Sequence, residues 1–131
     1  MRIWNFTPHS LNFYSESDTT PAPKIRKLII NTGAKPVLTV PSDGMLNAKI
    51  DYVKVDSNLP IVEYAPKVTA VDSIPENIAE DDIVVVSALY ISAYRIVHGT
   101  VDPRFRTISN PVYENESNPR PIGCLGVGLP I

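Results

Sequence analysis

The sequence predicts a β-rich α+β fold: a single domain over residues 1–131, with a mostly antiparallel or mixed sheet and one main buried helix at about residues 88–97. Two observations carry this prediction. The chain has 13 prolines but only 6 glycines, which disfavours long helices and favours short strands joined by stiff turns. Its 131 residues, 44% of them hydrophobic, suffice for one continuous core but not for two.

The first quarter of the chain is expected to consist of short strands and turns. Residues 2–6 read as a first strand, 7–10 as a turn, and 11–14 as the continuation of that strand or its hairpin partner. Residues 15–23 are polar and contain two prolines, so a solvent-exposed loop is expected there. Residues 24–31 alternate in the manner of another strand.

The middle of the chain predicts a meander. Residues 37–40 form a short apolar run, and the Pro-Ser-Asp-Gly segment at 41–44 favours a tight turn. Three further strand candidates follow, at residues 45–55, 59–64 and 67–71.

The best-defined elements are a buried strand and a helix. Residues 72–82 are acidic and suggest an exposed connection or one short helical turn, and their carboxylates are assigned no chemistry. The β-branched run at 83–86 is typical of a central strand buried on both faces. Ser87 can cap a helix that is apolar on most sides, and we expect this helix to pack deeply and to stop at His98-Gly99.

The C-terminal quarter is less clear. Arg104-Phe105-Arg106 fits a strand, residues 110–118 are rich in turn formers, and residues 122–127 fit a final strand. The strand at 83–86, the helix and this final strand are compatible with a βαβ unit, whose direction the long connection leaves open.

Composition argues against several classes of function. A net charge of −2 and a pI near 5.6 disfavour general nucleic-acid binding. Cys124 is the only cysteine, so no intramolecular disulfide and no thiolate metal cage are expected. Because we find neither a signal peptide nor a long apolar run, we expect a cytoplasmic protein without a membrane partner.

Four short motifs occur in a recognisable order. They are Asn-Phe-Thr-Pro-His at residues 5–9, Val-Pro-Ser-Asp-Gly at 40–44, Val-Val-Ser-Ala-Leu at 85–89 and Pro-Ile-Gly-Cys at 121–124. This order resembles a family of small uncharacterised phage and prophage proteins that begin with N-[LF]-T-P-H and carry a later V-S-A-L strand-to-helix junction. The resemblance covers most of the chain and implies a phage context, in which small accessory proteins often counter host defences.

Several residues are candidates for binding a phosphorylated ligand. Ser87 begins a helix whose free N–H groups suit a phosphate, although plain N-capping is the simpler interpretation. Arg104 and Arg106 flank Phe105, so in a strand both guanidinium groups would point to one face and could clamp phosphates, or merely lie on a solvated edge. The other candidates are Arg26, Arg95, Tyr90 and Tyr94, with Arg120 as a further cation.

No catalytic or metal constellation is convincing in the sequence. His9 and His98 have no evident partner, although His9 is kept as a candidate ligand donor. A pairing of Cys124 with either histidine is conceivable, but a lone cysteine in an apolar strand is more often part of the core. We therefore assign no catalytic residue, metal or cofactor.

The leading hypothesis is a phage-encoded homo-oligomer that sequesters a small phosphorylated ligand, such as a cyclic nucleotide or an ADP-ribose derivative used as a host immune signal, without turnover. One alternative is an enzyme that cleaves such a nucleotide, with His9 or His98 as general acid or base. Another is a structural or protein-interaction protein of the phage.

Overall fold

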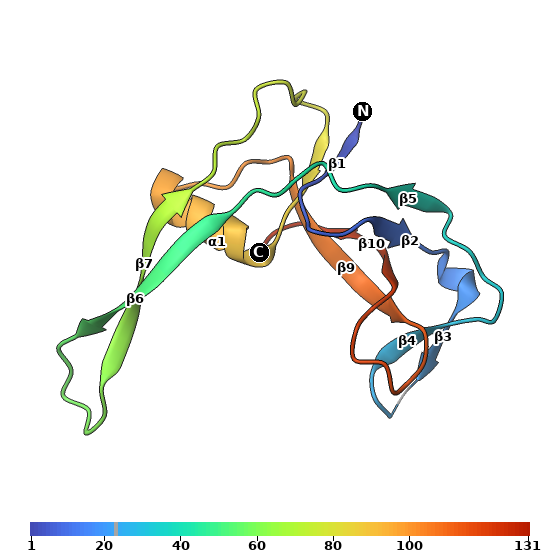
Figure 1. Cartoon of the computed structure of the whole chain (residues 1–131), viewed down its shortest axis with the longest axis horizontal. Helices are drawn as coiled ribbons and strands as arrows, with labels where there is room; N and C mark the ends of the chain where they lie inside the picture. The colour runs from blue at the N-terminus through green and yellow to red at the C-terminus, as the bar shows by residue number, and fades with distance from the viewer. Residues whose placement is uncertain (23) are drawn as a thin grey trace.

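The chain forms a mixed sheet, one helix and a separate two-stranded sheet (Figure 1). The computed structural model describes residues 1–22 and 24–131. In chain order the elements are β1 (Ile3–Asn5), β2 (Leu11–Phe13), the 3₁₀ helix η1 (Glu16–Asp18), β3 (Thr19–Ala22), β4 (Lys27–Ile30), β5 (Leu38–Val40), β6 (Ala48–Val55), β7 (Glu63–Val71), β8 (Ile83–Val85), α1 (Ala88–His98), β9 (Phe105–Tyr113) and β10 (Gly123–Gly128). This architecture confirms the predicted β-rich α+β fold.

The main sheet is organised around the long strand β9. Its strand order is β1-β8-β9-β10-β2-β5, with β4 added beside β9 and β3 beside β4. Strand β8 pairs in parallel with both β1 and β9, whereas β9 and β10 are antiparallel. Because it contains both parallel and antiparallel pairs, the sheet is mixed.

Strand β8 is central, as predicted. Val84 and Val85 are completely buried and Val86 nearly so. Successive side chains of a strand point to opposite faces. Val84 and Val86 therefore belong to one hydrophobic cluster, together with Tyr90 of α1 and Phe105 of β9. Val85 joins the other, which contains Leu11, Phe13 and Cys124. This confirms the expectation that Cys124 is a core residue.

The helix begins and ends where the sequence predicts. The Ser87 hydroxyl accepts a hydrogen bond from the Tyr90 N–H at 3.1 Å. At the other end Gly99 adopts φ 75°, a left-handed conformation, and its N–H donates to the Arg95 carbonyl at 2.8 Å.

The expectation that the helix is deeply packed was wrong for one of its faces. Only Tyr90, Ile91 and Ala93 are buried, because the helix lies on the outside of the fold and meets neighbouring elements on one side (Figure 1). The outer face leaves three apolar side chains exposed: Leu89, Ile96 and Val97.

The expected N-terminal loop is partly ordered structure. Residues 15–22 form η1 and β3, and β3 pairs antiparallel with β4, while Pro23 lies outside the described residues. The next strand begins at Lys27 rather than at residue 24, because Arg26 takes φ 52° in the turn that joins the two strands. The segment was expected to be a loop because it is polar. It contains two β-branched residues that favour a strand, Thr19 and Thr20, and these pair with Ile30 and Ile29.

The structure differs from the strand expectations at three points. Of the two alternatives for residues 2–14, the hairpin was wrong, since β1 pairs with β8 while β2 pairs with β5 and β10. Strand β9 continues into the turn-rich segment at 110–118 as far as Tyr113, with Asn110 at φ 56°. The parallel partner of β8 after the helix is β9, not the final strand, which runs antiparallel to β9.

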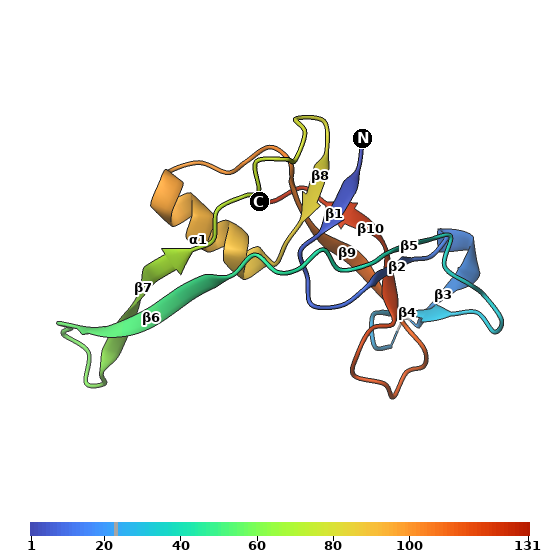
Figure 2. The ribbon, with the colours of Figure 1, turned by 45° about the horizontal axis from the view of Figure 1, so that its top comes forward.

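Strand β7 (Glu63–Val71) contains the end of the candidate at 59–64 and all of that at 67–71, pairs with β6 along its whole length and continues past Pro66, whereas residues 59–62 lie in the connecting loop. Together with their connecting loop these strands form a projecting hairpin, here called the arm (residues 48–71) (Figure 2). Its base packs against the α1 cluster through Ala48 and Val71. Its outer part extends away from the rest of the molecule.

Candidate functional site

A half-enclosed hollow of about 200 Å³ lies beside α1, and we call it the helix pocket. One face of α1 forms its first wall, Thr107 of β9 contributes to the second, and the last three residues of the chain close the third. The lining residues are Ala88, Ile91, Ser92, Arg95, Thr107, Leu129, Pro130 and Ile131.

The helix pocket combines hydrogen-bond donors with apolar walls. Arg95 contributes a guanidinium group, and Ser92 and Thr107 contribute hydroxyls. Ala88 belongs to the first turn of α1, where N–H groups without a helical partner and the positive end of the helix dipole favour anions. The Arg95 Nη2 donates to a main-chain oxygen of Ile131, and this contact occupies one of its donors and holds the guanidinium in place.

Two predicted arginines are engaged by the protein itself. The Arg104 guanidinium donates to both carboxylate oxygens of Asp102, at 2.9 and 2.8 Å, and to the Ile78 carbonyl at 3.0 Å. Through this pairing the pKa of Asp102 is lowered and that of Arg104 is raised. Arg106 folds back and donates to the carbonyls of Pro103 and Phe105. The structure therefore places both guanidinium groups on protein oxygens rather than around a common hollow.

The predicted tyrosines lie in the hydrophobic core. Tyr90 is 1% exposed, and its hydroxyl donates to the Asp72 carbonyl at 2.6 Å. Burial, with smaller effects from nearby Tyr94 and acidic groups, raises the pKa of Tyr90 to about 12. Tyr94 packs edge-on against Phe105 and tilted against His98. Through its hydrogen bond to Asp72, Tyr90 links α1 to the base of the arm.

His9 and Arg26 are exposed in separate turns. His9 lines a second hollow of about 230 Å³, between the turn at residues 7–10 and the start of β10, whose lining is mostly apolar. Buried Cys124 also lines this hollow, and burial raises the pKa of its thiol, which makes the thiolate nucleophile less accessible. Of the eight predicted residues, Arg95 lines the helix pocket and Ser87 adjoins it.

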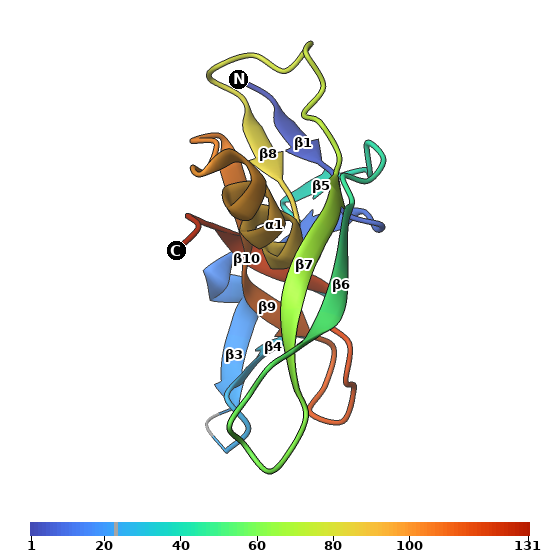
Figure 3. The ribbon, with the colours of Figure 1, turned by 90° about the vertical axis from the view of Figure 1, so that its left-hand side faces the viewer.

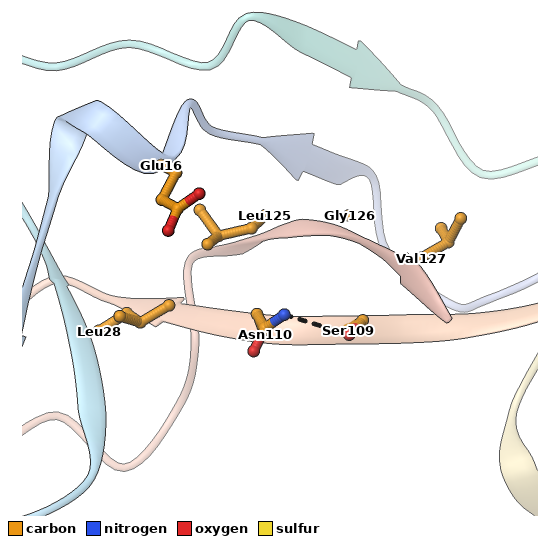
Figure 4. Close-up of a pocket in the computed structure, with 7 residues that line it drawn as sticks. All are labelled: Glu16, Leu28, Ser109, Asn110, Leu125, Gly126 and Val127. Atoms are coloured by element: carbon orange, nitrogen blue, oxygen red, sulfur yellow. Dashed lines mark hydrogen bonds between the residues drawn. The ribbon is translucent and has the colours of Figure 1, made fainter. Parts of the chain in front are cut away.

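A third and more open hollow of about 410 Å³ lies above β9 and β10 (Figure 4). Figure 4 shows the Asn110 amide donating to the Ser109 hydroxyl on its floor, with Glu16 of η1 above. Gly126 leaves open space, since a Cβ there would meet nothing within 4 Å. Because Glu16 is the charged residue of this lining and carries an anionic carboxylate, the hollow is poorly suited to a phosphorylated ligand.

Three of the four sequence motifs, at residues 5–9, 40–44 and 85–89, meet at Asn5, which sequence reasoning did not single out. Its side chain is 0% exposed. The Nδ2 donates to the carbonyls of His9, at 2.8 Å, and Val40, at 3.0 Å, while Oδ1 accepts from the N–H and hydroxyl of Thr7. The backbone of Asn5 also exchanges hydrogen bonds with Asp43 and pairs with Val85 of β8. The one available signal was an asparagine two residues before a threonine, a common turn pattern.

A second missed residue is Asp82, which belongs to the acidic run expected to be solvated. It is nearly buried, and its carboxylate accepts from the Trp4 indole at 2.9 Å, the Arg2 N–H at 2.8 Å and the Ala79 N–H at 3.0 Å. These bonds, led by that of Trp4, lower the pKa of Asp82. Asp82 thus holds the N-terminal strand to the segment before β8.

The comparisons and searches give no independent assignment of the site. No protein-family model, curated protein or solved structure matches the chain. Within residues 1–22 and 24–131, no group of three or more His, Cys, Asp or Glu side chains is placed to hold a metal ion. In the same part of the chain, no helix is long and apolar enough to cross a membrane.

Proposed function

We propose that this chain is a small phage-encoded binding protein that sequesters a nucleotide-derived host immune signal at the helix pocket, without turnover. It acts as a homo-oligomer in the cytoplasm of the host cell. The observation that carries the proposal is the donor set of the helix pocket, in which the Arg95 guanidinium, two hydroxyls and the first turn of α1 surround one hollow. Such a set favours phosphate oxygens.

Capture without turnover is favoured by the chemistry of the lining. Among the described residues that line the helix pocket there is no histidine, cysteine or carboxylate side chain, and these are the groups that most often transfer protons or attack phosphorus. The apolar side chains of Ile91 and Leu129 would contact a sugar or base instead.

The size of the pocket supports the oligomer in this proposal. At about 200 Å³ it is smaller than the roughly 300–1,000 Å³ of typical sites for whole small molecules. It therefore suits the phosphate end of a ligand, and the remainder would contact a neighbouring copy. The phage context is supported by the motif order, because three of the four motifs meet at the junction around Asn5 and Cys124 of the fourth packs in the same cluster as Val85.

The test is capture from a defined panel of cyclic nucleotides and ADP-ribose derivatives. Purified protein is mixed with each, removed by filtration and then heated, and both fractions are analysed by chromatography. The proposal expects one compound to disappear from the filtrate in stoichiometric amount and to return intact on heating. Arg95→Ala is expected to weaken capture about 10- to 100-fold, because a charge-assisted hydrogen bond contributes roughly 1.5–3 kcal/mol.

The matched control is Arg120→Ala, which removes the same charge from an exposed loop position outside the pocket. It is expected to capture as well as the wild-type protein. Equal loss in both variants would show that net charge matters and the pocket does not. A new chromatographic product would instead establish a nucleotide-cleaving enzyme.

A structural or protein-interaction role is the second candidate, and the exposed apolar arm is the observation that favours it. If no compound leaves the filtrate, this role replaces sequestration.

A further inference from the structure

The arm is an isolated two-stranded sheet. Strands β6 and β7 pair only with each other among the described strands, from Ala48↔Val71 at the base to Val55↔Glu63 near the tip. Figure 3 shows β6 and β7 beside α1 at their base and continuing beyond it toward the connecting loop. Two-stranded sheets are at best marginally stable on their own in water, so the outer arm lacks the partners that usually stabilise a sheet.

The outer arm carries large apolar side chains in contact with solvent. Tyr52 is 68% and Ile61 is 71% exposed. With them the arm exposes Val53, Leu59, Val62 and Tyr64. Single exposed apolar residues are ordinary, but a cluster of six on one projection is typical of an interaction surface.

The total surface indicates how much of the molecule lacks a partner. The accessible area is 8848 Å², whereas a compact monomer of this mass has about 6,800 Å². The excess of roughly 2,000 Å² on one copy is larger than the area of about 800 Å² that each partner buries in a standard protein–protein interface, so the exposed surface is sufficient for one.

The two outer edges of the arm are not equivalent. Pro66 stands opposite Tyr52 and has no N–H, so this pair cannot exchange the two hydrogen bonds of a bonded antiparallel pair. The backbone N–H and C=O of Tyr52 therefore point away from β7, and by alternation those of Lys54 do the same. The outer edge of β6 has free donors and acceptors, whereas that of β7 lacks a donor at Pro66.

We propose that the outer edge of β6 is a self-association surface, on which β6 of a second copy pairs antiparallel about a two-fold axis at Val53. In this register Tyr52 of one copy faces Lys54 of the other, and Asp51 faces Val55. No like charges stand opposite each other, and a lysine beside an aromatic ring is favourable. The two arms then form one four-stranded sheet, and their exposed apolar side chains lie side by side.

This inference rests on the self-association part of the proposed function and not on its ligand part. The surface lies on β6, whereas the helix pocket is lined by α1, β9 and the end of the chain. A protein that captures nucleotide but remains monomeric would overturn this inference and the self-association part of the proposed function, and would leave sequestration standing. A dimer that captures nothing would overturn sequestration alone.

The first experiment measures the molar mass of the full chain by light scattering across about 1–500 μM. Wild-type protein is expected to contain pairs of copies. Lys54→Pro removes one outward N–H and is expected to shift the mass to the monomer, whereas Lys54→Ala keeps that N–H and the wild-type mass. A monomeric wild-type protein, or an associated Lys54→Pro variant, would overturn the proposal.

A second variant decides the matter if Lys54→Pro does not fold. A two-fold axis at Val53 brings the two Val53 Cα atoms about 4.5 Å apart, within the range of a disulfide. Val53→Cys is therefore expected to form a covalent dimer under mild oxidation, in preference to Lys67→Cys on the exposed surface of β7. Equal yields of covalent dimer from the two variants would reject the pairing.

Discussion

The junction around Asn5 and the arm differ in what surrounds their strands. At the junction, the side chains of the short strands β1 and β8 and of the start of β9 are buried or half-buried, and Asn5 satisfies its polar atoms within the protein. In the arm, two longer strands form backbone hydrogen bonds only with each other among the described strands, and most of their side chains contact solvent. Strand length is therefore a poor guide to stability here, because burial and the number of neighbours decide it.

The largest effect is expected from Asn5→Ala. The substitution leaves the carbonyls of His9 and Val40 and the N–H of Thr7 without the partner that the amide provided. Since each buried polar group left unpaired costs about 1–3 kcal/mol, we expect the free energy of unfolding to fall by about 3 kcal/mol. Urea denaturation measures this loss.

Asn47→Ala is the control for the junction, because that side chain is exposed. A change below about 0.5 kcal/mol is expected there. If Asn5→Ala costs no more than the control, the junction is not the tightly held region that we describe.

An intermediate effect is expected from Tyr90→Phe, which removes the hydrogen bond between α1 and Asp72, the residue that follows the arm. Loss of the hydrogen bond to Asp72 is expected to cost about 1 kcal/mol at neutral pH. The pKa of Tyr90 is raised to about 12 from an ordinary value of 10.0, so the folded state favours the neutral phenol. The contribution of the neutral Tyr90 phenol to the free energy of unfolding is complete below pH 10 and is lost as the pH rises from 10 toward 12.

The difference in unfolding free energy between wild type and Tyr90→Phe should therefore shrink over this alkaline range, as measured by urea denaturation at several pH values. Tyr52→Phe, on the exposed arm, is the matched control and should follow the wild-type profile. A difference that stays constant up to pH 12 would contradict the buried environment of Tyr90.

The smallest effect is expected from Tyr52→Ser in dilute protein. A largely exposed side chain contributes little to the stability of one copy, so a change within about 0.5 kcal/mol is expected. At high protein concentration the same substitution should lower the melting temperature clearly, because association stabilises the folded state by mass action. Calorimetry at two concentrations measures both. A large loss at low concentration would show that the arm is packed within one copy.

The sequence was informative wherever local pattern and tertiary structure agree. The β-branched run before Ser87 predicted β8, and the cap and Gly99 predicted the ends of α1, because these signals depend on neighbouring residues alone. Strand pairing was not predictable to the same extent. That β9 continues through Asn110 depends on β10 and β4, which lie on either side of it in space but not in sequence.

The candidate site shows the same division. Arginine spacing suggested a clamp at Arg104 and Arg106, but Asp102 and nearby carbonyls engage both side chains. No periodicity in the sequence indicates that the last residues of the chain would reach Arg95. Polar residues with buried roles, such as Asn5 and Asp82, are hidden for a similar reason, since each has a partner far along the chain, Val40 at 35 residues from Asn5 and Trp4 at 78 residues from Asp82.

Pro66 also bears on how many copies of the protein can join into one sheet. A sheet with two open edges can add copies without limit, which is the route to fibrils. Because the outer edge of β7 lacks a donor at Pro66, the proposed pairing through β6 would leave both ends of the joined sheet blocked, and growth would stop at two copies. Pro66→Val would restore that donor, and the proposed pair would then be able to add further copies.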